Sequence, residues 1–169
     1  MGAALVLLLV GLGAMAAGVL IGRYYVKRLG GDRRVQTLVT LGTPHNGTPT
    51  AYLGIATMGL VAPSVWQMTP MSPFIRRLKA GPFPEQVRFA SIYSKADRFS
   101  PFPSALLESG DQPNLRNIEV ADCAHRALLT QKRVYDLVHG ELRAGEEARL
   151  RREQATPGHR PGKPPLRIA

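Results

Sequence analysis

The chain has 169 residues, a formal net charge of +10, one cysteine and no charged side chain before Arg23. This length is typical of a single domain and excludes multi-domain architectures and long solenoids. With 44% hydrophobic residues, 17 Gly and 14 Pro, the composition is that of a loop-rich globular protein. Cys123 has no cysteine partner in the chain, which excludes disulfide scaffolds and cysteine-rich zinc or redox motifs.

The first 22 residues carry no charge and are followed at once by Arg23, Lys27 and Arg28. A run of this length is long enough to cross a hydrocarbon core of about 30 Å as a helix. We therefore expect residues 1–22 to form a hydrophobic helix, either a membrane span or a buried helix of a cytoplasmic protein. For a span, the positive charges after it favour a cytoplasmic location for the rest of the chain. A cleaved secretory signal is not expected, because no Lys or Arg precedes the run.

A strand is expected at residues 35–42, whose sequence VQTLVTLG is short, apolar and rich in β-branched residues. Such a run is typical of a strand that is buried on both faces, as in a parallel sheet. Residues 24–29 before it continue a helical pattern, which Gly30 and Gly31 end. The order of helix, tight turn and buried strand indicates an α/β fold. Residues 43–47 (TPHNG) then form a turn-rich loop, where α/β sheets place functional groups.

Residues 48–84 carry prolines at a density that permits only short helices separated by turns. Apolar side chains lie between these prolines: Leu53, Ile55, Met58, Leu60, Val61, Trp66, Met68 and Met71. We expect this segment to be a mobile apolar cap. The alternative is an ordinary helical insertion, and for any single one of these side chains we expect a place in the core.

The second half of the chain predicts two more strands. Residues 87–93 (VRFASIY) are rich in β-formers, and Asp97 lies just beyond them. Residues 117–120 (NIEV) lead to His125 in a loop, and residues 127–142 have apolar positions at helical spacing. We expect the fold to end at residue 142. Residues 143–169 are basic and contain several prolines, which predicts a short helical extension and then a disordered tail.

Asp97 and His125 are the candidate chemical residues. The loops after successive parallel strands lie at one edge of a sheet, so these two residues can meet although they are far apart in sequence. Acyl transfer uses such a pair, because the imidazole accepts the nucleophile's proton and the carboxylate fixes its tautomer. The alternative for a single histidine in a loop is a surface or capping role.

Five longer segments follow one another in order: LIGRYYVKRLGG at residues 20–31, VQTLVTLGTPHNGT at 35–48, SPFIRRL at 72–78, VRFASIYSKAD at 87–97 and NIEVADCAHRALLTQKRVYDLV at 117–138. Together they resemble the region after the nucleophile elbow of bacterial α/β-hydrolase lipases and esterases of the triacylglycerol lipase type. The resemblance covers about residues 20–142, and TLGTPHNGT is a fairly specific motif within it.

The resemblance implies a partial α/β-hydrolase fold at residues 23–142, with the C-terminal strands and helices of a mostly parallel sheet and a proline-rich helical cap insertion. It implies hydrolysis of a carboxylic ester or lipid by a Ser-His-Asp triad, which requires no metal or organic cofactor. Asp97 would be the triad acid and His125 the general base. Thr43, Pro44 and His45 would shape the strand end and be structural.

The nucleophile is the point at which the sequence departs from this family. The elbow G-x-S-x-G should fall on residues 14–18, where the chain reads Ala-Met-Ala-Ala-Gly. Ala16 therefore stands at the nucleophile position, and a methyl group cannot attack a carbonyl. The first glycine of the elbow is replaced by Ala14. The serines near Asp97 are not in an elbow context and are not expected to substitute: Ser94, Ser100 and Ser104.

Two hypotheses for function follow. In the first, the chain is the C-terminal portion of a lipase or esterase, a shortened chain whose ester-hydrolase chemistry is absent or crippled. In the second, residues 1–22 anchor a non-catalytic protein in a membrane, and its apolar cap binds lipid or a partner, with basic residues near an anionic leaflet. Nucleic-acid binding is not expected, because the positive charges concentrate in a proline-rich tail without interleaved aromatic residues.

Overall fold

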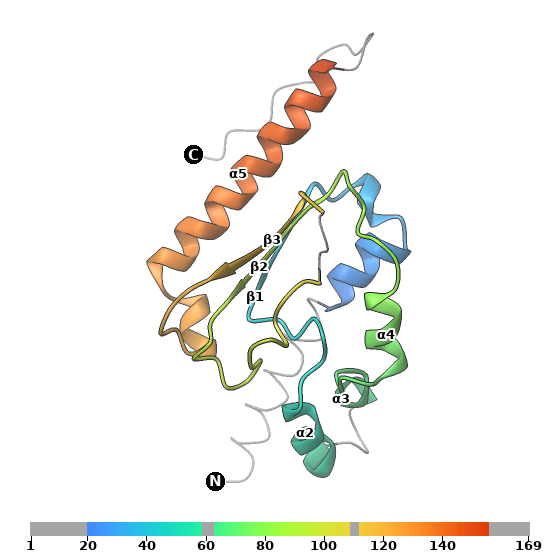
Figure 1. Cartoon of the computed structure of the whole chain (residues 1–169), viewed down its shortest axis with the longest axis vertical. Helices are drawn as coiled ribbons and strands as arrows, with labels where there is room; N and C mark the ends of the chain where they lie inside the picture. Colours follow the sequence, from blue (N-terminus) through green and yellow to red (C-terminus); the bar gives the residue numbers. More distant parts are fainter. Residues whose placement is uncertain (1–19, 59–62, 109–111, 156–169) are drawn as a thin grey trace.

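The computed structural model describes residues 20–58, 63–108 and 112–155, which form a mixed α/β fold around a small parallel sheet (Figure 1). The sheet contains β1 (Thr37–Leu41), β2 (Arg88–Tyr93) and β3 (Leu115–Glu119), in the order β1-β2-β3. Both strand pairings are parallel. The parallel arrangement predicted from the three buried runs is thereby confirmed, with small differences in where each strand begins and ends.

The two faces of the sheet are covered by different parts of the chain. On one face, apolar side chains of the strands pack under α5 (Lys132–Ala155) and form a cluster with residues of that helix: Val39, Leu41, Ile92, Ile118, Val134, Leu137 and Val138. On the other face, Leu38, Phe89 and Leu115 pack with Val26 from the helical residues 20–28. The central strand β2 is thus buried on both faces, as its apolar sequence predicts, whereas most residues of the edge strand β3 are exposed.

Polar and close contacts fix α5 on the sheet. Glu141 is buried on this helix and accepts hydrogen bonds from Arg88 of β2 at 2.6 Å and from Arg116 of β3 at 2.8 Å. Gly145 lies so close to Thr37 of β1 that an added Cβ atom would overlap the threonine hydroxyl. Helix α5 therefore packs against all three strands, and Gly145 extends its contact with β1 beyond residue 142, where the apolar spacing placed the end of the fold.

Residues 20–28 form a helix whose basic side chains bind the C-terminal end of α4 (Pro73–Lys79). Lys27 Nζ and the guanidinium groups of Arg23 and Arg28 donate to carbonyl oxygens at that end: those of Arg77, Leu78, Ala80 and Gly81. These carbonyls lack partners within the helix, and their partial negative charge favours cations. Burial, with Arg23 and Arg28 nearby, lowers the pKa of Lys27 to about 8.

The cap segment, residues 48–84, contains three short helices: α2 (Thr50–Met58), α3 (Pro63–Gln67) and α4. Helix α4 begins with a favourable sequence, because the Ser72 hydroxyl accepts the Ile75 N–H at 3.1 Å and Pro73 occupies the first helical position. The short helices separated by turns agree with the proline spacing.

The apolar residues of the cap segment divide into two groups. Val65, Met68, Ile75 and Leu78 are buried together in one cluster with Leu20 and Ala51. A second group is more than half exposed: Leu53, Trp66 and Met71. The expectation that each of the named apolar side chains lies in the core is therefore wrong for these three, because short helices with prolines between them do not present one continuous apolar face.

A 3₁₀ helix, η2 (His125–Leu129), follows β3 and precedes α5. The sequence pattern predicted one helix over residues 127–142, whereas the chain forms this tighter turn first and starts the α-helix at Lys132. Residues 1–19 and 156–169, which include most of the candidate span, Ala16 and most of the basic tail, lie outside the described residues. Within the described ranges, no helix is both long and apolar enough to cross a bilayer.

Candidate active site

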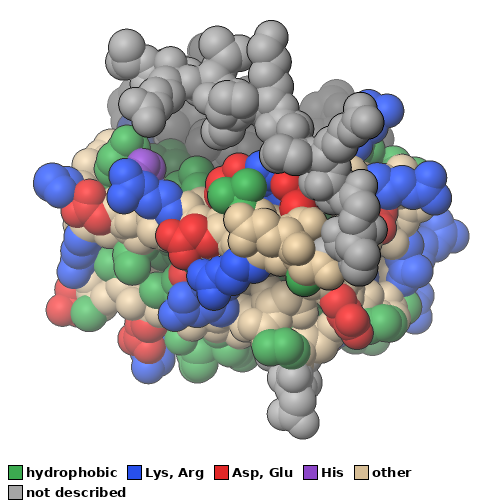
Figure 2. Space-filling view, turned by 90° about the horizontal axis from the view of Figure 1, so that it is seen from above, with side chains coloured by type: hydrophobic (Ala, Val, Ile, Leu, Met, Phe, Trp, Pro, Cys, Tyr) green, Lys and Arg blue, Asp and Glu red, His purple; other side chains and the backbone are tan. Residues whose placement is uncertain are grey.

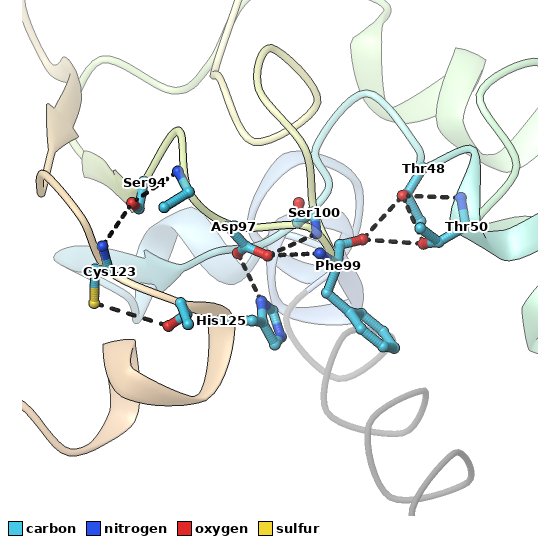
Figure 3. Close-up of polar contacts among 10 residues, drawn as sticks. Thr48, Thr50, Ser94, Asp97, Phe99, Ser100, Cys123 and His125 are labelled. Atoms are coloured by element: carbon cyan, nitrogen blue, oxygen red, sulfur yellow. Dashed lines mark hydrogen bonds and ion pairs between the residues drawn. The ribbon is translucent and has the colours of Figure 1, made fainter.

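Asp97 and His125 meet at the carboxyl edge of the parallel sheet. Asp97 follows the end of β2, and His125 begins η2 after β3. The distance between Asp97 Oδ2 and His125 Nδ1 is 2.7 Å. Figure 3 shows the two side chains pointing toward one another from their separate loops. The parallel topology thus places this pair together, as we inferred from the spacing of strands and polar residues.

Backbone hydrogen bonds hold the carboxylate of Asp97 in one orientation. Its Oδ1 atom accepts the N–H groups of Phe99 at 2.8 Å and Ser100 at 3.0 Å, which leaves Oδ2 for the imidazole. The Asp97 residue is 2% exposed. When this carboxylate is ionised it only accepts hydrogen bonds, so Nδ1–H of His125 is the donor, and the neutral imidazole then has its lone pair on Nε2.

The imidazole of His125 is stacked on one face and is partly exposed. The Phe99 ring stacks on it with centroids 5.2 Å apart and an interplanar angle of 28°. The His125 side chain is 23% exposed, and its Nε2 has no hydrogen-bond partner among the described residues. A histidine oriented through Nδ1 with an open Nε2 has the geometry required of a general base.

Gly42 provides the space in which the pair meets. This residue follows β1 and has a φ of +52°. A Cβ atom on it would lie 2.7 Å from Asp97 Oδ2, 2.8 Å from Leu128 Cδ1 and 3.0 Å from His125 Nδ1. Sequence reasoning treated Gly42 only as the end of a strand. A glycine at the carboxyl end of a buried strand is the signal that could have identified this close approach.

Ser94 connects the acid loop to the base loop. Its buried hydroxyl oxygen accepts the Cys123 N–H at 3.1 Å and the Ala96 N–H at 3.2 Å. Cys123 lies two residues before His125, so this bond fixes the spacing between the loops that carry Asp97 and His125. Ser94 is therefore a structural link rather than a nucleophile in this arrangement.

The other two serines near the acid are also buried. Ser104 donates its hydroxyl to the Gly47 carbonyl oxygen. Ser100 Oγ is buried without a hydrogen-bond partner in the described part of the chain, and no hydrogen bond joins it to His125. Among the described residues, no hydrogen bond joins Ser94, Ser100 or Ser104 to His125.

His45 lies apart from this pair and inside the fold. It is 1% exposed, and its Nε2 is 2.9 Å from Thr40 Oγ1. The Thr40 hydroxyl donates to the Ala90 carbonyl oxygen, so His45 donates its Nε2–H to Thr40 Oγ1. Burial, with a smaller contribution from Arg23, lowers the pKa of His45 well below its usual value. A structural role, as expected for His45, fits this environment.

The buried Arg23 stabilises the loop that contains His45. Arg23 Nη1 donates to the His45 carbonyl oxygen at 3.1 Å, and its guanidinium lies 4.8 Å from the centroid of the Phe83 ring. Burial lowers the pKa of Arg23 to about 10, and Glu108 opposes this shift. Arg23 thus joins the helical residues 20–28 to both the loop after β1 and the end of α4.

An apolar hollow lies near the pair. Its volume is about 420 Å³, and apolar side chains from β1, η2 and α5 contribute most of its lining, among them Leu41, Leu128, Leu129, Val134, Tyr135 and Val138. Two of these lining residues lie next to Gly42: Leu41 precedes it in the chain, and Leu128 Cδ1 would be 2.8 Å from a Cβ atom added to it. In the described ranges, no group of three His, Cys, Asp or Glu side chains is arranged to hold a metal ion.

Neither a scan against protein-family models nor a search of curated proteins gives a match to this chain. The fold and site therefore define a class by geometry alone: a mixed α/β protein whose parallel sheet carries a hydrogen-bonded Asp–His pair at its carboxyl edge.

Proposed function

We propose that this chain carries the acid and the base of a Ser-His-Asp carboxylic-ester hydrolase site, of the triacylglycerol lipase type, in a partial α/β-hydrolase fold. The observation that carries the proposal is the 2.7 Å hydrogen bond between Asp97 and His125, which leaves Nε2 without a hydrogen-bond partner among the described residues. The order of the strands and the resemblance of residues 20–142 to these lipases support it. Lipid or other carboxylic esters are the proposed substrate class.

The chemistry of the pair is that of proton transfer. His125 Nε2 takes the proton of an attacking hydroxyl as the new C–O bond forms, and it returns that proton to the leaving alkoxide when the ester bond breaks. Asp97 keeps Nδ1–H pointed at its carboxylate and stabilises the imidazolium between these two steps. Because Asp97 is fixed by two backbone N–H groups, its orientation is set before any substrate binds.

The proposed nucleophile position is Ala16, which has no hydroxyl group. We therefore expect the unaltered chain to show no ester hydrolysis beyond that of a His125→Ala variant. The function proposed for residues 20–142 is that of an acid–base half-site, to which a hydroxyl nucleophile must be supplied for turnover.

The test is to supply the hydroxyl and to ask whether His125 activates it. In an Ala14→Gly/Ala16→Ser variant, the elbow regains its first glycine and its serine. We expect a fluorophosphonate probe to label this variant covalently, because phosphonylation of serine requires an activated hydroxyl. The matched control is Ala14→Gly/Ala17→Ser, which places a hydroxyl one residue further along and is expected to remain unlabelled.

The dependence on His125 decides the outcome. Adding His125→Ala to the serine variant is expected to abolish labelling, and adding Asp97→Ala is expected to slow it. Labelling that is unaffected by His125→Ala, or no labelling of the folded serine variant, would contradict the proposal. Hydrolysis of an ester by the unaltered chain that depends on His125 would show that the assignment of the nucleophile position is wrong.

A further inference from the structure

Phe99 is the residue at which the acid, the base and the cap segment meet. Its N–H donates to Asp97 Oδ1 at 2.8 Å, and its ring stacks on the imidazole of His125. Its carbonyl oxygen is 3.1 Å from Thr48 Oγ1 and 3.0 Å from Thr50 Oγ1. Figure 3 shows these contacts as one connected chain, with the Phe99 ring beside His125 and its carbonyl facing the two threonines.

The threonines attach the start of α2 to the acid loop. Thr48 is buried, Thr50 is the first residue of α2, and their hydroxyl oxygens are 2.8 Å apart. The two hydroxyl oxygens and the Phe99 carbonyl oxygen therefore make three mutual contacts, for which the two threonines supply only two hydroxyl protons. The two protons cannot both lie between the threonines, so at least one hydroxyl donates to the Phe99 carbonyl at any time. This carbonyl is thus tied to the cap segment.

Two contacts are needed to fix the direction of His125 Nε2. The hydrogen bond from Nδ1 to Asp97 fixes one edge of the imidazole, but hydrogen-bond angles are broad and this contact alone permits a range of tilts of the ring plane. Stacking with the Phe99 ring restricts this rotation, because it fixes the plane of the imidazole. The position of the Phe99 ring depends in turn on its backbone, which Asp97, Thr48 and Thr50 hold.

We propose that Phe99 is a positioning residue that sets the plane of the His125 imidazole, and that Thr48 and Thr50 make this plane depend on the first turn of the cap segment. This inference rests on the proposed function, in which His125 is the base. A displacement of the start of α2 is expected to loosen Phe99 and, through it, the direction of Nε2.

The inference is tested by NMR on the unaltered nucleophile-free chain, so no ester turnover is needed. The readouts are the low-field Nδ1 proton of His125, whose exchange with water reports the persistence of the hydrogen bond to Asp97, and the ring-current shift that Phe99 imposes on the imidazole protons. We expect Phe99→Leu to accelerate Nδ1 exchange about two- to tenfold, the factor that corresponds to loss of an aromatic contact. Phe99→Tyr keeps a ring and is expected to restore the slow exchange.

The threonine variants test the connection to the cap segment. Thr48→Val/Thr50→Val keeps the Phe99 ring but removes both hydroxyls, and we expect faster Nδ1 exchange and a smaller ring-current shift. Thr48→Ser/Thr50→Ser keeps the hydroxyls and is expected to match the unaltered chain. Thr69→Val is the matched cap control, because the Thr69 hydroxyl donates to the Trp66 carbonyl oxygen within the cap.

The possible outcomes separate the two proposals. If the Nδ1 proton of the unaltered chain shows no hydrogen bond to Asp97, the proposed function fails. If that bond is present, but Nδ1 exchange is unchanged by Phe99→Leu and both readouts are unchanged by the valine variants, only the present inference fails. Thr50→Val alone alters a half-exposed residue and is measured in parallel, so that a folding defect of the double variant does not decide the result.

Discussion

The contact between Asp97 and His125 depends directly on Gly42, and Gly42→Ala tests that dependence. The φ of Gly42 is +52°, a region that an L side chain enters at a cost of about 1–2 kcal/mol. The added Cβ would also approach Asp97 Oδ2 to 2.7 Å and Leu128 Cδ1 to 2.8 Å. Making room in a packed site costs about 1–3 kcal/mol more. We therefore expect the free energy of unfolding to fall by about 2–5 kcal/mol.

Gly30→Ala is the matched control for this prediction. Gly30 has a φ of +71°, and no heavy atom lies within 4 Å of the position of an added Cβ. This variant has the backbone cost alone, so we expect a loss of about 1–2 kcal/mol. Urea denaturation gives the two free energies, and the Nδ1 proton of His125 shows whether its bond to Asp97 is lost in Gly42→Ala and kept in Gly30→Ala.

The difference in stability loss between Gly42→Ala and Gly30→Ala shows which atoms Gly42 lies against. If Gly42→Ala and Gly30→Ala lose the same stability, and the low-field Nδ1 proton is unchanged in both, then Gly42 does not lie against the pair. A larger loss for Gly42→Ala without any change at His125 would place the clash on Leu128 alone.

Three further predictions concern the buried groups around the site. The pKa of His45 is lowered in the fold, so below pH 6.5 the unfolded chain binds a proton that the folded chain excludes; stability should fall by up to about 1.4 kcal/mol per pH unit. Urea denaturation across pH should show a shallower acid loss in His45→Gln, and equal slopes would contradict this. Gly145→Ala should lower the free energy of unfolding by about 1–3 kcal/mol, and by much less in a Thr37→Ala background. The control is Gly140→Ala, which has open space around it and should stabilise the helix by about 0.5–1 kcal/mol. Additive effects of Gly145→Ala and Thr37→Ala would argue against the close approach of Gly145 to Thr37. Ser94→Ala leaves two backbone N–H groups without their acceptor and should cost about 1–3 kcal/mol, with a broadened His125 signal; an unchanged midpoint and signal would show that the loops are held by other contacts.

The strands and the meeting of Asp97 with His125 could be predicted from the sequence because both depend on simple rules. Short β-branched runs predict buried parallel strands, and loops after parallel strands share one edge. The positions of Asp97 and His125 after two such runs were therefore sufficient to bring them together. The precise ends of the strands and the 3₁₀ turn at His125 depend on tertiary packing and have no comparable periodic signal.

The role of Phe99 could not be predicted in the same way. Its stacking on His125 depends on the conformation of the loop after Asp97, where two consecutive N–H groups bind the carboxylate. Similarly, the packing of α5 near and beyond residue 142 depends on a buried glutamate, Glu141, and a closely packed glycine, Gly145, neither of which contributes to an apolar pattern. Such contacts arise from close approach and ion pairing between distant segments.

The most direct measurement is the hydrolysis of p-nitrophenyl butyrate by the Ala14→Gly/Ala16→Ser variant, with and without His125→Ala. The account predicts that this variant releases p-nitrophenol, and that His125→Ala lowers the rate by about a hundredfold or more, as loss of a general base does. The matched Ala14→Gly/Ala17→Ser chain should remain inactive. Release that is equally fast without His125, or no release from the folded variant, would contradict the assignment of Asp97 and His125 as an acid–base pair.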